Sequence, residues 1–296
     1  HSMSWLWFSL SSVFLFALSN VIDKALLTHK VKNPNLPVIV DMFLGLLFAA
    51  VVVLFHGIDT VSPQSIIVLM GLGIVYLLVL LSYFKAMQLE EVSRVVPLYD
   101  INVLFVLVFS ILFLGKTFEI SQIGGILLLM AGGILISQHN FSKIRLGKAA
   151  FFVLLGALGL SIYFTASDYL LQGVSVETFF VFVRIGAFLG MLPILWLNRK
   201  DMGKMVASPA KYGFGIIVLS ESITVISTFL GSTGIQQASG AFYSAIAATQ
   251  PVFVFILATA LSFFLPHILK EETGNRNLLQ KGVAIILIYL GVLLLG

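Results

Sequence analysis

A few charged side chains interrupt long apolar runs in this chain, and they are the first candidates for its chemistry. Glu221 lies in LSESITVIST (219–228), about ten residues into such a run at 1.5 Å per helical residue. An ionisable group in a hydrocarbon layer costs about 2.5–3.5 kcal/mol, so each one needs a partner or a function. We interpret Glu221 as a carboxylate that binds a proton or a cation. A structural acid paired with a neighbouring helix is the alternative.

Asp100 belongs to a polar group in PLYDIN, which also contains Tyr99 and Asn102. Pro97 precedes these residues and frees a backbone carbonyl one turn back. Asp100 therefore either lines a binding cavity or holds a network with Arg94 or Lys85, and the sequence favours neither.

Four further charged residues are the gate or ion-pair candidates: Asp41, Lys85, Asp168 and Arg184. Arg184 and Asp168 are predicted at similar depth, so we expect them to form an ion pair. The alternative for Arg184 is a bidentate grip on a substrate carboxylate or phosphate. Asp41 is expected to pair with Lys24 or Lys85. Two clusters would then flank the midplane, with ion pairs that form on one side and break on the other: a cytoplasmic cluster of Asp23, Lys24, Asp41, Lys85 and Arg94, and an outer cluster of Asp168 and Arg184.

Several neutral polar residues are predicted at central depth and complete the set of substrate candidates. Hydroxyl groups on membrane helices serve packing more often than ligand binding. The Gln250-Pro251 step is a stronger signal, because a proline in mid-span opens the backbone. The neutral candidates are Tyr99, Asn102, Tyr163, Thr224, Tyr243 and Gln250.

The elements that would position these residues follow from the composition. The 296 residues are 59% hydrophobic and 10% charged, whereas an average soluble domain has roughly 25% charged residues. This excludes a water-soluble globule and predicts an all-α integral membrane protein of ten transmembrane helices. The ten predicted spans are 5–27, 36–55, 64–88, 92–114, 119–137, 148–171, 177–197, 211–235, 240–265 and 278–295.

Lys and Arg predict the orientation of these spans. Fifteen of the seventeen lie on the links after the odd-numbered spans or at the adjoining helix ends. Lys116 is on the opposite side, and Arg184 is inside a span. Because basic loops stay in the cytoplasm, both termini are expected outside, in a prokaryotic cytoplasmic membrane.

The two halves of the chain are predicted to be repeats. A shift of 148 residues lays 83–106 on 231–254 and aligns Gln88 with Gln236 and Asn102 with Gln250. Five spans per half make the second unit inverted relative to the first. We therefore expect two inverted five-helix repeats, 3–140 and 146–296, with a substrate site between them near the midplane.

Short motifs then resemble the EamA-type unit of the drug/metabolite transporter superfamily. In the first half they are Ala86-x-x-Leu89-x-x-Val92-Ser93, Phe113-Leu114-Gly115-Lys116, Gln122-x-Gly124-Gly125 and Gly132-Gly133. In the second half they are Gly240, Gln250-Pro251-Val252-Phe253, Gln280-x-Gly282 and Gly291. Lys116 replaces the usual acid, and Val103 the usual proline. The resemblance implies a secondary transporter of a small, amino-acid-like metabolite that works by alternating access, with proton coupling or exchange. A lipid or lipid-headgroup flippase is the alternative.

Other function classes lack their motifs. All five histidines lie in predicted loops or helix ends, and the chain has neither cysteine nor an H-E-x-x-H sequence, so we expect no enzyme, metal site or cofactor. No phosphate-binding loop is present, and the dispersed basic residues do not favour nucleic acid. The expected partners are a small solute, the lipid bilayer and a coupling proton, in a monomer or homodimer.

Overall fold

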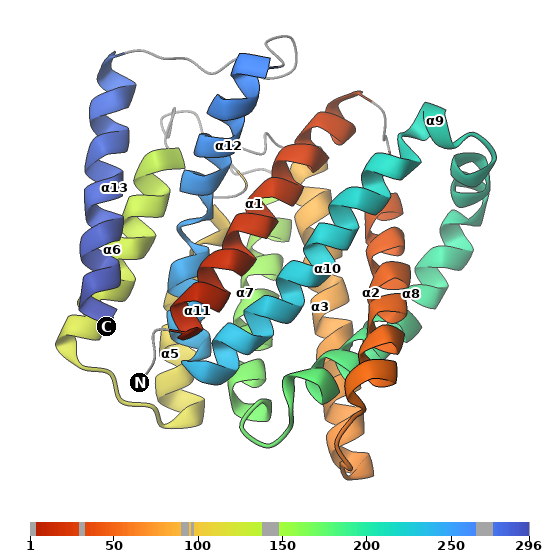
Figure 1. Ribbon diagram of the computed structural model, residues 1–296, viewed down its shortest axis with the longest axis horizontal. Helices are drawn as coiled ribbons and strands as arrows, with labels where there is room; N and C mark the ends of the chain where they lie inside the picture. Colours follow the sequence, from red (N-terminus) through yellow and green to blue (C-terminus); the bar gives the residue numbers. More distant parts are fainter. Residues whose placement is uncertain are drawn as a thin grey trace.

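A computed structural model describes residues 4–29, 33–89, 95, 98–137, 148–264 and 275–295, and they form a bundle of helices (Figure 1). The helices of the first half are α1 (Ser4–His29), α2 (Asn35–His56), α3 (Pro63–Leu89), α5 (Asn102–Leu114) and α6 (Ile120–Ser137). The helices of the second half are α7 (Lys148–Leu170), α8 (Val176–Ala207), α9 (Pro209–Tyr212), α10 (Phe214–Gln237), α11 (Gly240–Ala247), α12 (Gln250–Phe264) and α13 (Asn275–Leu295).

The apolar length of these helices indicates a multi-pass integral membrane protein. Seven segments of the described residues are long and apolar enough to span a bilayer, including 240–257 across the break between α11 and α12. Three shorter apolar helices accompany them, at Asn102–Leu114, Ile120–Leu135 and Gly282–Leu295. Helices satisfy their own backbone hydrogen bonds, which is why they suit a hydrocarbon layer. The count of ten spans remains a prediction.

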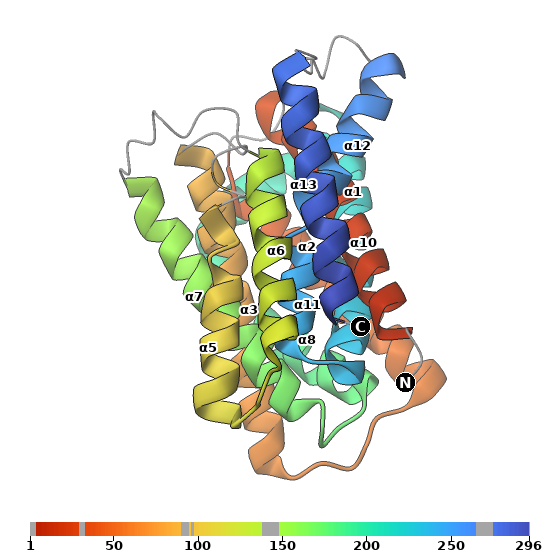
Figure 2. The same cartoon turned by 90° about the vertical axis from the view of Figure 1, so that its left-hand side faces the viewer.

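The helices of one half pack mainly against helices of the other. In Figure 1, α1 lies along α10 and α6 lies along α13, while Figure 2 shows α6 and α13 side by side from the neighbouring direction. The further contacts join α3 to α7 and α8, α2 to α8 and α10, α1 to α12, and α5 to α7. If each helix is replaced by its counterpart in the other half, the list of helix contacts stays largely the same, as expected for a duplicated unit. The inverted repeat itself remains a prediction.

Glycines set the closest approaches between helices. A Cβ atom at Gly73 of α3 would overlap the carbonyl oxygen of Val183 in α8, and one at Gly186 would overlap that of Met70. Since small residues let membrane helices approach at backbone distance, these two glycines hold α3 against α8. Their contact brings Tyr76 and Arg184 together in the centre of the bundle.

Both chain termini lie at one end of the bundle (Figure 1). Ser19 and Asp23 are in the second half of α1, and Glu221 is in the first half of α10. The polar centre described below therefore lies toward the end opposite the termini.

Candidate functional site

A cavity of about 160 Å³ lies between the two halves of the bundle. Its wall combines carboxyl groups, neutral polar groups and aromatic rings from α1, α3, α7, α10 and α11, from the segment before α5, and from the first residues of α5 and α12. Seven of the eight substrate candidates named from the sequence line it: Tyr99, Asp100, Asn102, Glu221, Thr224, Tyr243 and Gln250.

Two helix interruptions bring Asp100 and Gln250 to the cavity. The first is the turn at Asp100 and Ile101 before α5, and the second is at Ala248 and Thr249 between α11 and α12. The two interruptions are 148 residues apart, which equals the shift found in the sequence. A break in a membrane helix is tolerated where it lines a cavity and its backbone groups find other partners.

Local hydrogen bonds hold the first interruption. Asn102 Nδ2 donates to the carbonyl oxygen of Tyr99 at 2.6 Å, and Ser161 Oγ of α7 donates to the carbonyl oxygen of Asn102 at 3.2 Å. Pro97, which we expected to free a backbone carbonyl near these residues, lies outside the described residues.

The second interruption rests on α6. Thr249 Oγ1 donates to the carbonyl oxygen of Ile246 at 2.7 Å. A Cβ atom at Gly133 of α6 would overlap the carbonyl oxygen of Ala248. Glycine at 133 therefore leaves the space in which the broken helix, and with it Gln250, takes its position.

Two carboxyl groups of the cavity wall have free oxygens. Glu221 is 2% exposed and its Oε1 has no hydrogen-bond partner within the described residues. Asp100 is 7% exposed, and its Oδ2 is equally unpartnered there, as is Oδ1 of Asn102. Burying a charge costs heavily unless it is paired, so these carboxyl groups carry a cost that no described partner offsets.

A third acid of the wall, Asp23, was placed by sequence in a cluster of ion pairs and not in the site. Its Oδ1 accepts a hydrogen bond from Ser220 Oγ at 2.6 Å, and its Oδ2 lies 3.5 Å from Ser19 Oγ. Ser19 Oγ is also 2.7 Å from Thr224 Oγ1. The signal that could have found this acid is the polar stripe on α1, where Ser12, Ser19 and Asp23 recur at helical spacing and face α10.

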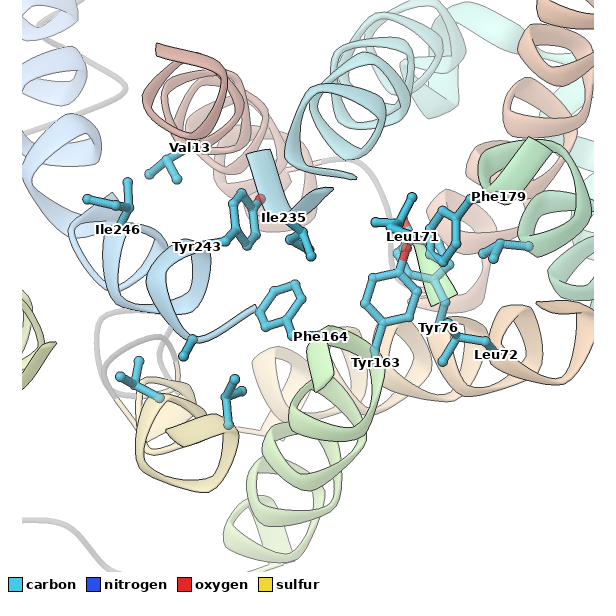
Figure 3. Packing of buried hydrophobic residues seen from close by; sticks show 14 of the residues in the cluster. Val13, Leu72, Tyr76, Tyr163, Phe164, Leu171, Phe179, Ile235, Tyr243 and Ile246 are labelled. Carbon is cyan, nitrogen blue, oxygen red and sulfur yellow. The ribbon is translucent and has the colours of Figure 1, made fainter. Parts of the chain in front are cut away.

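Aromatic rings pack in and beside the wall of the cavity. Figure 3 shows Tyr163 against Tyr76 and Phe164 against Tyr243, with ring centroids 5.5 Å and 5.2 Å apart. The Tyr243 hydroxyl is 2.8 Å from Ser12 Oγ. Tyr163, our eighth substrate candidate, is not among the residues that line the cavity and packs behind Tyr76.

The predicted Arg184–Asp168 ion pair is wrong. Arg184 Nη1 lies 2.7 Å from Asp41 Oδ2, and both side chains are buried, at 1% and 0% exposure. The guanidinium carbon is 4.8 Å from the centroid of the Tyr76 ring and 5.2 Å from that of Phe180. Arg184 and Asp41 therefore meet, although the sequence placed them on opposite sides of the midplane.

The physical reason is the reach of arginine across a glycine. A Cβ atom at Gly45 would lie 2.7 Å from Cδ and 2.9 Å from Nη1 of Arg184, so the side chain crosses α2 where Cβ is missing. It then reaches Asp41, one turn earlier on the same helix. Lys85, one of the expected partners of Asp41, instead donates to Gln88 Oε1 at 2.8 Å. The side chain of Lys24 and the whole of Arg94 lie outside the described residues.

Asp168 has a different cation as its partner. Lys116 Nζ lies 2.6 Å from both oxygens of Asp168, and the backbone N–H of Gly240 donates to Oδ2 at 2.9 Å. This contact, which we call the terminal latch (Lys116, Asp168, Gly240), joins the loop after α5 to the end of α7 and the start of α11. Lys116 was already distinguished in sequence as the basic residue on the side opposite the other loops.

The wall of the cavity presents carboxyl, hydroxyl and amide groups beside aromatic rings. Among the residues that the structure describes, no group of three His, Asp or Glu side chains comes close enough to hold an ion.

The chain is similar to known proteins over part or all of its length. Residues 3–138 match the model of the EamA-like transporter family. The chain is also 33% identical over 57 residues to an uncharacterized transporter in the cobO 3' region of Sinorhizobium sp. That match spans 19% of this chain and 40% of the relative's length.

The fold recurs in a solved crystal structure of a protein. It superposes with a TM-score of 0.72 over 99% of this chain and 96% of the other, at 16% sequence identity. The likeness extends over the whole helical bundle, including the part that the family model does not match.

Proposed function

We propose that this chain, whose residues 3–138 match the EamA-like transporter family, is a secondary transporter that moves a small polar, amino-acid-like or related metabolite by alternating access. The observation that carries the proposal is the cavity between the two halves, with the unpartnered carboxyl groups of Glu221 and Asp100 in its wall. An unpaired carboxyl group adds a cost to helix packing, whereas a polar cavity between helices suits a solute that leaves water.

Two features support alternating access. The helix interruptions next to Asp100 and Gln250 resemble the broken helices that carry substrate sites in transporters. Toward the termini, the terminal latch and the Tyr243–Ser12 contact join the two halves, and we take them as the gate on that side. Moving one half against the other would break these contacts and open the site to the second face.

Proton coupling is the second element of the proposal, and Glu221 is its candidate. The charged groups that act on Glu221 from the neighbouring helices are Asp23, Asp41 and Arg184, and Tyr83 of α3 lies within the same electrostatic environment. Arg184 is neutralised by Asp41, so a proton or a cationic solute would compensate the charge on Glu221.

The lipid-flippase alternative is less well supported. A cavity of about 160 Å³ is comparable to cavities of about 150 Å³ that hold a benzene molecule. This volume favours a small solute over a lipid headgroup with its attached chains.

Transport in proteoliposomes tests the proposal. The purified chain, reconstituted with an imposed pH gradient, is expected to take up a solute selected by a thermal-shift screen of amines, amino acids, nucleotides and headgroups. Glu221→Gln should abolish pH-driven uptake, whereas Asp201→Asn, on an exposed acid outside the cavity, should leave it unchanged. Full pH-driven uptake by Glu221→Gln would exclude Glu221 as the coupling group.

Cysteine labelling tests alternating access separately. The chain contains no cysteine, so Thr224→Cys places a single thiol in the cavity. A carrier exposes this thiol to one face at a time, and the solute shifts the balance between faces. Equal labelling from both faces in the absence of solute would indicate a channel.

A further inference from the structure

The cavity has an electrostatic imbalance that bears on what it binds. Three carboxyl groups line it, from Asp23, Asp100 and Glu221, and none of the described residues in its wall is Lys, Arg or His. The nearest described cation, Arg184, is 1% exposed and lies against Asp41, Tyr76 and Phe180 instead of facing the cavity.

An acidic cluster alone does not identify a ligand. Two further observations point to one: unpartnered carboxyl oxygens, and aromatic rings in the same wall. Oε1 of Glu221 and Oδ2 of Asp100 are unpartnered within the described residues, on side chains that are 2% and 7% exposed. They belong to the wall of one cavity and come from opposite halves of the chain. Asp23 differs, because Ser220 and Ser19 already engage its oxygens.

The rest of the wall is aromatic. The rings are Phe16, Tyr76, Tyr83, Phe84, Tyr99, Phe164 and Tyr243. Tyr83 meets Tyr99 edge to face, with centroids 5.4 Å apart. The faces of such rings attract cations, and the attraction is strongest where water is excluded.

We infer that the cavity binds a small organic cation, an amine that carries positive charge and no carboxylate, held by Glu221 and Asp100 among these aromatic rings. The inference rests on the proposed transport function and narrows its substrate class. A carboxylate on the ligand would meet three acids and no described cation in the wall, whereas an ammonium group would supply the missing positive charge.

The size of the cavity limits the ligand further. A volume of about 160 Å³ corresponds to a molecule somewhat larger than benzene, for which about 150 Å³ suffices. Benzylammonium meets this limit and joins a ring to an ammonium group, so it is a suitable probe.

A set of matched probes tests the inference with the full chain in detergent. Melting temperatures are measured against increasing benzylammonium, benzyl alcohol and benzoate, which are similar in size and differ in charge. Ligand binding raises the melting temperature according to its concentration and affinity. Benzylammonium is expected to bind at least tenfold more tightly than benzyl alcohol, and benzoate should give no shift. Equal or tighter binding of the alcohol or of benzoate would overturn the inference.

A second pair of probes separates an amine from an amino acid. Phenylglycine is benzylamine with a carboxylate on the amine-bearing carbon, and α-methylbenzylammonium has a methyl group at the same place. The methyl compound is expected to bind and phenylglycine is expected not to. If phenylglycine binds as tightly as the methyl compound, the site accepts amino acids and the restriction to cations is wrong.

Two variants test whether Glu221 and Asp100 bind the positive charge of the ligand. Glu221→Gln and Asp100→Asn should each weaken benzylammonium at least tenfold, about 1.4 kcal/mol, without weakening benzyl alcohol. The control Asp201→Asn should change neither affinity. Unchanged benzylammonium affinity in both cavity variants would place the cation elsewhere. The wild-type probe series remains decisive if a variant fails to fold.

The outcomes distinguish this inference from the transport proposal. If no cation binds while another solute shows transport that depends on Glu221, the substrate class is wrong and the transporter stands. If benzylammonium binds in the cavity but reconstituted protein moves no solute, the binding site stands and the transport proposal falls.

Discussion

Buried carboxyl groups occur in two regions of the same bundle and have opposite surroundings. Asp41 is 0% exposed and pairs with Arg184 at 2.7 Å between aromatic rings. Glu221 and Asp100 are nearly as buried, and no described cation forms an ion pair with either of them. One oxygen of each lacks a hydrogen-bond partner in the described structure, as does Oδ1 of Asp41, so the difference between the two regions is the guanidinium group on Asp41. We therefore propose that the pair serves stability and that the cavity acids serve binding.

Removing one partner of the Asp41–Arg184 pair is expected to have the largest effect on stability. Arg184→Met leaves the Asp41 carboxylate uncompensated, which should lower the free energy of unfolding by about 3–5 kcal/mol. Chemical unfolding in detergent measures it. The double variant Asp41→Leu/Arg184→Met should recover most of the loss, because no lone charge remains. A double variant as unstable as the single one would mean that the charge balance does not stabilise this region.

The second-largest effect on stability is expected where α3 packs against α8, the contact that brings Tyr76 to Arg184. Gly73→Ala places a Cβ atom against the carbonyl oxygen of Val183, so α3 and α8 must separate. We expect a loss of about 1–3 kcal/mol in the free energy of unfolding, as for overpacked cores. Gly71→Ala is the matched control two residues earlier on α3, since no atom lies within 4 Å of its added Cβ. Equal effects of both changes would show that the helix contact is not responsible.

Neutralising a cavity acid should raise the free energy of unfolding instead of lowering it. Glu221→Gln removes a buried charge that has no described partner at Oε1, so we expect it to raise the free energy of unfolding by about 0.5–2 kcal/mol in the absence of ligand. Thermal unfolding at neutral pH measures the change. A marked loss of stability would indicate that Glu221 is a structural acid like Asp41, and the contrast between the two regions would disappear.

A surface carboxyl group gives the smallest effect and a reference for both regions. Asp59, in the loop after α2, accepts hydrogen bonds from the backbone of Ser175 at 2.7 Å and from Thr178 Oγ1 at 3.0 Å. Hydrogen bonding by Ser175 first, and then by Thr178, lowers the pKa of Asp59.

Because its pKa is lower in the folded protein, Asp59 stabilises the fold above the ordinary aspartate pKa of about 3.9 and loses this contribution as the pH falls through the folded value. Between about pH 5 and pH 3, roughly one unit to either side of that pKa, the melting temperature of Asp59→Asn should therefore change less than that of the wild type. A parallel decline in both proteins would assign the acid sensitivity to other groups.

The sequence predicted the residues of the cavity better than their ion pairs. Depth along an apolar run is readable from counting, so Glu221, Asp100 and Thr224 were found as a group. Gln250 was found through the proline that follows it. Asp23 was assigned to ion pairs because its place in the cavity depends on Ser220, which lies 197 residues away.

The prediction of the ion pairs was wrong for a physical reason. Counting gives the depth of a Cα atom, but an arginine side chain extends over more than one helical turn and follows the free space around it. Gly45 provides this space on α2, so Arg184 reaches Asp41, and Asp168 is left to Lys116.

The sequence by itself determined that this chain crosses a membrane, because hydrophobic length is a local property, and it determined which polar residues are buried there. It also carried the 148-residue shift that relates the two helix interruptions. Only the tertiary structure decided which buried charges are paired and which face a cavity. That decision depends on contacts between helices of opposite halves, where a glycine's missing Cβ or a serine's hydroxyl determines which side chains can meet.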